Sequence, residues 1–182
     1  NTSRTFGWPP SGFTLHWWGE ALGNAGARAA LVSSVEIAAC ASGLALVLGT
    51  MAAFPGHRHQ WFGREAVSFL VILPIALPGI VTGIALNSAF SFGGIPLGFL
   101  TVVVGHATFC IVVVYNNVLA RLRRTGTSLE EASSDLGANG LVTFVLVTLP
   151  QLRSALLAGG LLAFALSFDE IVVTQFTISA GL

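Results

Sequence analysis

The chain has 182 residues, of which 54% are hydrophobic and 9% are charged, and its formal net charge is zero. Charged residues normally make up about a quarter of a soluble domain, so this composition excludes an ordinary soluble protein and indicates a membrane protein. A chain without net positive charge also lacks the basic surface that nucleic acid requires, so we expect no nucleic-acid partner.

The sequence carries no pattern typical of catalysis, metal binding or a cofactor. Cys40 and Cys110 each lie in an apolar run, where lone cysteines act as packing residues. His57 and His59 lie close together, but their short loop supplies no further metal ligand. We therefore expect no catalytic residue, no metal site and no cofactor, and the chain is not predicted to be an enzyme.

The first 24 residues are polar and rich in aromatic side chains. Trp17 and Trp18 fit a membrane–water interface, and a solvated aromatic loop is the alternative. Pro9, Pro10 and Gly12 disfavour a helix in this segment. The segment has neither the basic start nor the continuous apolar core of a signal peptide, and the chain starts without Met, so we expect a piece of a longer protein.

Four apolar stretches are long enough to cross the hydrocarbon core of a membrane, which is about 30 Å thick. We predict an all-α membrane protein with one transmembrane domain over residues 1–182 and spans over 29–54, 66–90, 97–119 and 154–176. Pro55 is expected to end the first span.

The second and third spans carry residues that break or mark a membrane helix. Pro74 and Pro78 are expected to kink or break the second span, because proline removes a backbone donor. Gly79 and Gly83 form a small-residue pair suited to close helix contact. In the third span, His106 is interpreted as a hydrogen-bonded packing residue, and a proton relay is the alternative.

The connection 120–153 is a long polar interruption that contains a short predicted helix. One face is apolar or small, and it consists of Leu129, Ala132, Ser133 and Leu136. The opposite face is polar, and it consists of Glu130, Glu131, Ser134 and Asp135. A capping box is expected at the start, from Ser128 with Glu131 or Thr127 with Glu130. Gly137 is expected to end the helix in the left-handed conformation.

The fourth span carries two adjacent carboxylates, Asp169 and Glu170, in its outer part. Carboxylates within a membrane normally face the interior of a helix bundle or a watery cavity. A functional and a structural role are both open for this pair.

The arginines set the expected orientation through the positive-inside rule. They gather in the first and third connections, as Arg58, Arg64, Arg121, Arg123, Arg124 and Arg153, whereas the second connection has none. We therefore expect a multi-pass protein whose N-terminus lies outside and whose 120–153 loop lies in the cytoplasm.

A motif in this loop resembles the EAA signature of ABC importer permeases. Its residues are Glu131-Ala132-Ser133, three residues, Gly137, nine residues, Val147, one residue and Leu149-Pro150. Ser133 and Val147 replace the Ala and Ile of the family pattern, and the spacing is intact. The alternative is a capped amphipathic helix lying on the membrane surface.

Two further stretches are similar to the spermidine/putrescine-type branch of that family. They are Leu73-Pro74-Ile75-Ala76-Leu77-Pro78-Gly79-Ile80-Val81 and Ser167-Phe168-Asp169-Glu170-Ile171-Val172-Val173-Thr174-Gln175-Phe176. The resemblance implies the type I ABC importer (MetI-like) transmembrane fold, whose usual six spans would be represented by the second to the fifth. It also implies a place in the bacterial plasma (inner) membrane, surrounded by lipid.

The resemblance further implies a function and partners. The chain would form the pathway for a small solute, a polyamine or a related cation, with a second permease subunit, a dimer of ATP-binding subunits and an extracytoplasmic solute-binding protein. With the motif and the apolar helix face taken together, the residues expected to couple to the ATPase are Leu129, Glu131, Ala132, Ser133, Leu136, Gly137, Leu149 and Pro150. We expect Asp169 to line the translocation path of a cationic solute and Glu170 to be a structural partner, with an even balance between a functional and a structural role for the pair. The alternatives are a permease for another solute (an anion, ferric ion, sugar or amino acid) and a membrane scaffold without transport activity.

Overall fold

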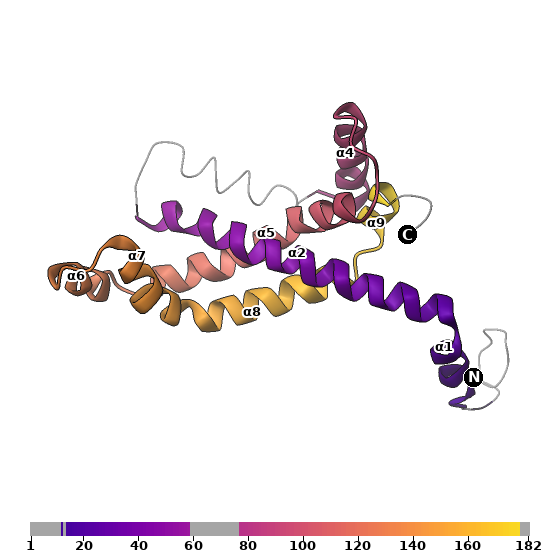
Figure 1. Cartoon of the computed structure of the whole chain (residues 1–182), viewed down its shortest axis with the longest axis horizontal. Helices are drawn as coiled ribbons and strands as arrows, with labels where there is room; N and C mark the ends of the chain where they lie inside the picture. The colour runs from indigo at the N-terminus through magenta and orange to yellow at the C-terminus, as the bar shows by residue number, and fades with distance from the viewer. Residues whose placement is uncertain (1–11, 13, 59–76, 179–182) are drawn as a thin grey trace. The chain divides into compact units, whose positions relative to one another are not determined.

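The computed structural model describes residue 12 and residues 14–58 and 77–178, and every regular element in these ranges is helical (Figure 1). Two compact units are present, Asn1–Glu36 and Ile37–Leu182. Within the described ranges, three helical stretches are long and apolar enough to span a membrane: Ala25–Phe54, Phe99–Arg124 and Gly140–Phe168. The all-helical membrane architecture expected from the composition is therefore confirmed.

The first unit contains helix α1 (His16–Gly23) and the start of helix α2 (Ala25–Arg58). The expectation that no helix forms before residue 24 is wrong for residues 16–23. Gly12 precedes this helix, and Pro9 and Pro10 lie outside the described residues. Asn24 separates the two helices and begins the second, because its side-chain oxygen accepts hydrogen bonds from the backbone N–H groups of Gly26 and Ala27 (2.9 and 3.2 Å).

The first expected span is present as α2, which also continues past Pro55 to Arg58. A proline in the last turn of a helix removes one backbone hydrogen bond without ending the helix. The first part of the second expected span, residues 66–76 with Pro74, lies outside the described residues, as do His59 and Arg64. Its remainder is helix α4 (Gly79–Phe92), which begins directly after Pro78 as expected.

Helix α4 packs closely on helix α9 (Val172–Thr177) through small residues. A Cβ atom on Gly83 would lie only 2.6 Å from Cδ2 of Phe176. A Cβ atom on Gly79 would lie 3.6 Å from Cβ of Val172. The close contact predicted for this glycine pair is confirmed, and it has the small-residue packing typical of membrane helices.

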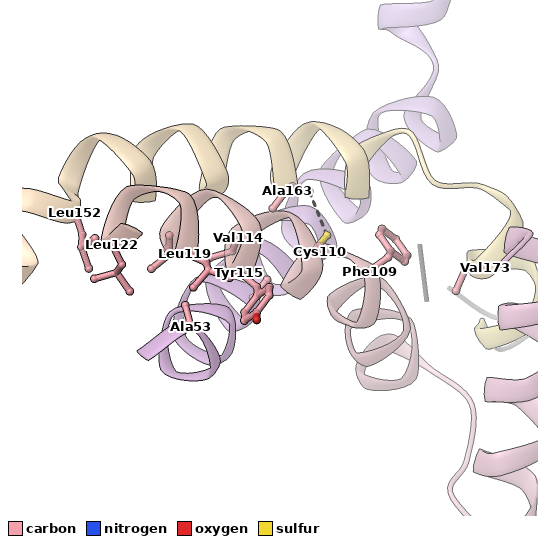
Figure 2. Packing of buried hydrophobic residues seen from close by; sticks show 12 residues of the cluster. Ala53, Phe109, Cys110, Val114, Tyr115, Leu119, Leu122, Leu152, Ala163 and Val173 are labelled. Atoms are coloured by element: carbon pink, nitrogen blue, oxygen red, sulfur yellow. Dashed lines mark hydrogen bonds between the residues drawn. The ribbon is translucent and has the colours of Figure 1, made fainter. Parts of the chain in front are cut away.

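Helix α5 (Phe99–Arg124) is the central element of the second unit, and it runs beside helix α8 (Leu149–Phe168) (Figure 1). Figure 2 shows its buried side chains, Phe109 to Leu122, between Ala53 of α2 and Leu152 and Ala163 of α8. Small residues allow these close approaches. A Cβ atom on Gly159 would lie 3.4 Å from the Val114 backbone, and one on Gly49 would lie 2.9 Å from the Ile111 carbonyl oxygen.

The fourth expected span, 154–176, differs from the structure at both ends. Helix α7 (Gly140–Thr143), π-helix η1 (Phe144–Thr148) and α8 follow one another without a gap, so the apolar stretch starts at Gly140. Pro150 does not stop this stretch. The Leu149 N–H bonds the Phe144 carbonyl five residues back, and this wider turn accommodates a proline that has no N–H of its own.

The same span ends early, at Phe168, and α9 begins only at Val172. We refer to residues 169–171 as the helix break. Asp169 is the C-cap residue of α8, and Glu170 lies in the helix break itself. The expectation that both carboxylates project from one continuous helix is therefore wrong.

Candidate functional site

Helix α6 (Ser128–Asp135) forms where the sequence predicts a short helix, but its start is built differently from the expected capping box. The N-cap residue Thr127 has helical dihedral angles and caps no backbone N–H with its side chain. Its hydroxyl group instead donates to the Glu131 carboxylate (2.7 Å). This contact holds the exposed Glu131 side chain toward the start of the helix.

Two side-chain contacts join α6 to the segment that leads into α8. The Thr148 hydroxyl donates to the Glu130 carboxylate over 2.7 Å, and the hydroxyl groups of Ser133 and Thr143 are 3.0 Å apart. Thr143 and Thr148 are buried. Glu130 and Ser133 are three residues apart and share one side of the helix, so this side faces the transmembrane part of the chain.

Next to this attached side, α6 has an exposed apolar strip. Leu129 is 57% exposed and Leu136 is 89% exposed, and Ala132 between them is also exposed. Of the four residues predicted for the apolar face, three are therefore in solvent and Ser133 is turned inward to Thr143. Glu130, expected on the polar outer face, is likewise turned inward to Thr148.

Gly137 ends α6 as expected, with a φ of +85°. The Gly137 N–H bonds the Ser134 carbonyl (2.9 Å) and the Ala138 N–H bonds the Ser133 carbonyl (3.1 Å). This pair of bonds satisfies two carbonyl groups that the end of a helix would otherwise leave free. The chain then turns into α7, where the Asn139 side chain caps the Val142 N–H (2.9 Å).

Leu149 and Pro150 are exposed at the first turn of α8. The next residue joins this turn to the end of α5, because the Arg121 side chain donates through Nε to the Gln151 carbonyl (3.0 Å). A narrow hollow lies between the end of α5 and the start of α6 and α8, lined by Leu122, Thr125, Gly126, Thr127, Glu130, Thr148, Gln151 and Leu152. The motif is thus held to the ends of both long helices.

The helix break places its two carboxylates differently. Asp169 is exposed. Glu170 is half-buried, and its carboxylate accepts a hydrogen bond from the Val173 N–H (2.9 Å), which caps the start of α9. It also lines an open hollow of about 120 Å³ together with Leu77, Gly79, Thr82, Phe109, Leu166 and Val173.

His106 is buried beside the helix break, with both ring nitrogens in hydrogen bonds. Its Nδ1 lies 2.8 Å from the Ser167 hydroxyl oxygen, and its Nε2 lies 2.8 Å from the Thr174 hydroxyl oxygen. The interpretation as a hydrogen-bonded residue is therefore confirmed. Within the described ranges, no three His, Cys, Asp or Glu side chains are arranged to hold a metal ion.

Sequence reasoning missed the partners that hold these groups in place: Thr143, Thr148, Ser167 and Thr174. Thr148 contacts a residue 18 positions away, and Thr174 contacts one 68 positions away. No spacing rule within one helix covers such separations. The available signal was the presence of hydroxyl side chains in otherwise apolar runs, where each needs a hydrogen-bond partner.

Comparison with known proteins gives one family and several relatives. Residues 45–182 match the family model described as binding-protein-dependent transport system inner membrane component. The putrescine transport system permease protein PotI of Escherichia coli K12 is 36% identical over 178 residues, which cover 94% of this chain and 63% of PotI.

Two further relatives differ in the solute that their names give. The spermidine/putrescine transport system permease protein PotC of Haemophilus influenzae Rd is 33% identical over 165 residues, covering 91% of this chain and 64% of PotC. The putative 2-aminoethylphosphonate transport system permease protein PhnV of Salmonella typhimurium LT2 is 32% identical over 174 residues, covering 94% of this chain and 65% of PhnV. The chain spans just under two thirds of the length of these relatives.

Proposed function

Since the chain belongs to the family of binding-protein-dependent transport system inner membrane components, we propose that it forms the solute pathway of an ABC importer as one permease subunit. It would pair with a second permease, receive its solute from an extracytoplasmic binding protein and be driven by a dimer of ATP-binding subunits. ATP hydrolysis would belong to those partners. The family membership supports each of these roles.

The observation that carries this proposal is the construction of α6. A short helix with an exposed apolar face is an unstable arrangement in water unless a partner covers it. Here the helix is attached along the neighbouring side by the Glu130–Thr148 and Ser133–Thr143 contacts. A force on α6 would therefore pass through α7 and η1 into α8, which follows them without a gap, as coupling between an ATPase and a membrane pathway requires.

In this proposal, Leu129, Ala132 and Leu136 enter a groove on the ATPase. Glu131 and Ser133 hold α6 in shape, and Gly137 sets the turn that follows it. Leu149 and Pro150 lie at the start of α8, where motion of α6 enters the membrane-spanning part. The loop around α6 would lie in the cytoplasm, consistent with Arg121, Arg123 and Arg124 in the last turn of α5.

We infer that the solute is a polyamine such as putrescine or spermidine. The relatives PotI and PotC, which carry these solutes in their names, support this inference. Asp169 would line the path near its outer mouth, because its exposed carboxylate offers a charge-assisted acceptor to an ammonium group. Glu170 has the more structural position, since it caps α9.

A second candidate solute is an organophosphonate, which the relative PhnV supports at a similar identity and coverage. Thermal melting of the cognate binding protein with each solute separates the two. A ligand that binds the native state raises the melting temperature by mass action. We expect putrescine or spermidine to raise it, and 2-aminoethylphosphonate to leave it unchanged. The reverse result would refute the polyamine assignment and leave the permease assignment standing.

A further inference from the structure

His106 lies beside the helix break that separates α8 from α9. It comes from α5, is 2% exposed and contacts Ser167 and Thr174. Ser167 is the second-to-last residue of α8, and Thr174 is in the first turn of α9. A single side chain therefore joins both edges of the helix break to the central helix.

The hydrogen bonds of Thr174 and Ser167 indicate which ring nitrogen of His106 carries a hydrogen atom. The Thr174 hydroxyl donates its one hydrogen to the Glu170 carbonyl (2.7 Å), so its oxygen accepts from Nε2–H of His106. In a neutral imidazole, Nδ1 then carries no hydrogen and accepts from the Ser167 hydroxyl. We refer to this set of hydrogen bonds between Ser167, His106, Thr174 and Glu170 as the hydrogen-bond relay. With this tautomer, each donor in it meets an acceptor, which restrains the orientation of the ring.

The relay continues into the helix break itself. Thr174 holds the Glu170 carbonyl, and the Glu170 carboxylate holds the Val173 N–H (2.9 Å). Asp169 precedes Glu170 directly, and its own N–H remains bonded to α8 through the Ala165 carbonyl (3.2 Å). The backbone on both sides of Asp169 is thus fixed, whereas its carboxylate is exposed.

We propose that His106 is a positioning residue for transport: through Ser167 and Thr174 it sets the geometry of the helix break and so the direction of the Asp169 carboxylate toward the passing solute. This inference rests on the proposed function, because it assumes that Asp169 meets the solute. His106 itself does not contact the solute. A polar residue buried among membrane helices is usually retained for such a bridging role.

The test uses Thr174→Val and Thr174→Ser in the full-length protein, reconstituted with its partner permease, ATPase and binding protein. Thr174→Val keeps the shape of the side chain but removes the partner of Nε2 and the bond to Glu170, whereas Thr174→Ser keeps the hydroxyl group. We expect Thr174→Val to raise the KM for putrescine uptake about tenfold, equivalent to roughly 1.4 kcal/mol, with kcat nearly unchanged. Thr174→Ser should behave like the unmodified protein.

Thr177→Val is the matched control. Thr177 lies one turn further along α9, is fully buried and donates to the carbonyl four residues back, as Thr174 does, but its hydroxyl bonds Val173 rather than the helix break. It should leave KM unchanged. Equal KM values for Thr174→Val and Thr174→Ser, or an equal rise in Thr177→Val, would overturn the proposal.

A second readout needs no solute. Imidazole ¹⁵N NMR of the full-length protein labelled at histidine should show His106 with a protonated Nε2 and an unprotonated Nδ1, and Thr174→Val should remove this preference. A protonated Nδ1 in the unmodified protein would overturn the relay. If the reconstituted protein moves no polyamine, the proposed solute fails, and the NMR result still decides whether the relay exists.

Discussion

At Gly137, the backbone conformation rather than the available space decides which substitutions are tolerated. A Cβ atom there would meet no atom within 4 Å, and the same holds for Gly140, but Gly137 alone of the two has a positive φ. We predict that Gly137→Ala lowers the stability of the protein by about 1–2 kcal/mol, because the left-handed region is strained for residues with a Cβ atom. Thermal melting of the purified protein measures this.

Gly140→Ala is the control for that prediction. The same added methyl group should be neutral or slightly stabilising, by about 0.4–1 kcal/mol, since it restricts the unfolded chain at a position without strain. Equal losses of melting temperature in both variants would show that the turn at Gly137 is not the cause.

The Glu130–Thr148 contact is the second feature that depends on single side chains. We predict that Thr148→Val lowers stability by about 1.5–3 kcal/mol, the usual contribution of a hydrogen bond to a charged group. Thr50→Val is the matched control, because the buried Thr50 hydroxyl has no hydrogen-bond partner among the residues that the structure describes. That variant should be neutral or more stable, and a loss as large as that of Thr148→Val would contradict the assignment.

At the scale of single residues, features decided by neighbours in the sequence could be predicted, whereas contacts between residues far apart in the sequence could not. Gly137 could be assigned from its place after a helical pattern, because helix termination is decided within a few residues. The inward turn of Glu130 could not, because the sequence pattern places it among polar residues that look solvent-exposed. Its partner, Thr148, lies beyond the next turn and the following helix.

At the scale of the elements, helix α6 carries the exposed apolar residues that are proposed to bind the ATPase. We predict that Ala132→Phe prevents association with the ATPase while leaving membrane insertion intact, because an added ring overpacks a groove fitted to a small residue. Pull-down of the ATPase from detergent solution, with the amount of inserted permease measured in parallel, tests this.

Ser134→Phe adds the same ring to another exposed position of α6, on the side that carries the exposed Glu131 and Asp135. It should retain ATPase binding. If Ser134→Phe abolishes association and Ala132→Phe does not, the docking face is the acidic side of α6 rather than the apolar one.

The long helices show what hydropathy can and cannot predict. The third expected span is present, because an unbroken apolar run has only helical solutions within a membrane. The fourth was misplaced at both ends. The helical stretch begins before the expected span, at Gly140, and passes through Pro150 because the π-helix Phe144–Thr148 accommodates the proline. The break after Phe168 was missed, because the residues that follow Glu170 are as apolar as those of the span before it.

At the scale of the whole molecule, the distribution of arginines predicts the orientation in the membrane. Gly126, exposed between α5 and α6, should lie in the cytoplasm, and Ser91, exposed near the end of α4, should lie outside. We predict that a membrane-impermeant thiol reagent applied to intact cells labels Ser91→Cys and not Gly126→Cys. The exposed Cys40 is replaced by Ser in both variants, and Cys110 is buried. Labelling of Gly126→Cys from outside would reverse the orientation.

The measurement that tests the central claim most directly is ATP-dependent uptake of labelled putrescine by vesicles. They contain the full-length protein with its partner permease, ATPase and binding protein. We predict saturable accumulation that requires ATP. Asp169→Asn should reduce it by about tenfold, as expected for the loss of a charge-assisted contact, without changing ATPase activity in the absence of the binding protein. Accumulation of 2-aminoethylphosphonate in place of putrescine, or uptake of putrescine that Asp169→Asn leaves unchanged, would contradict the account.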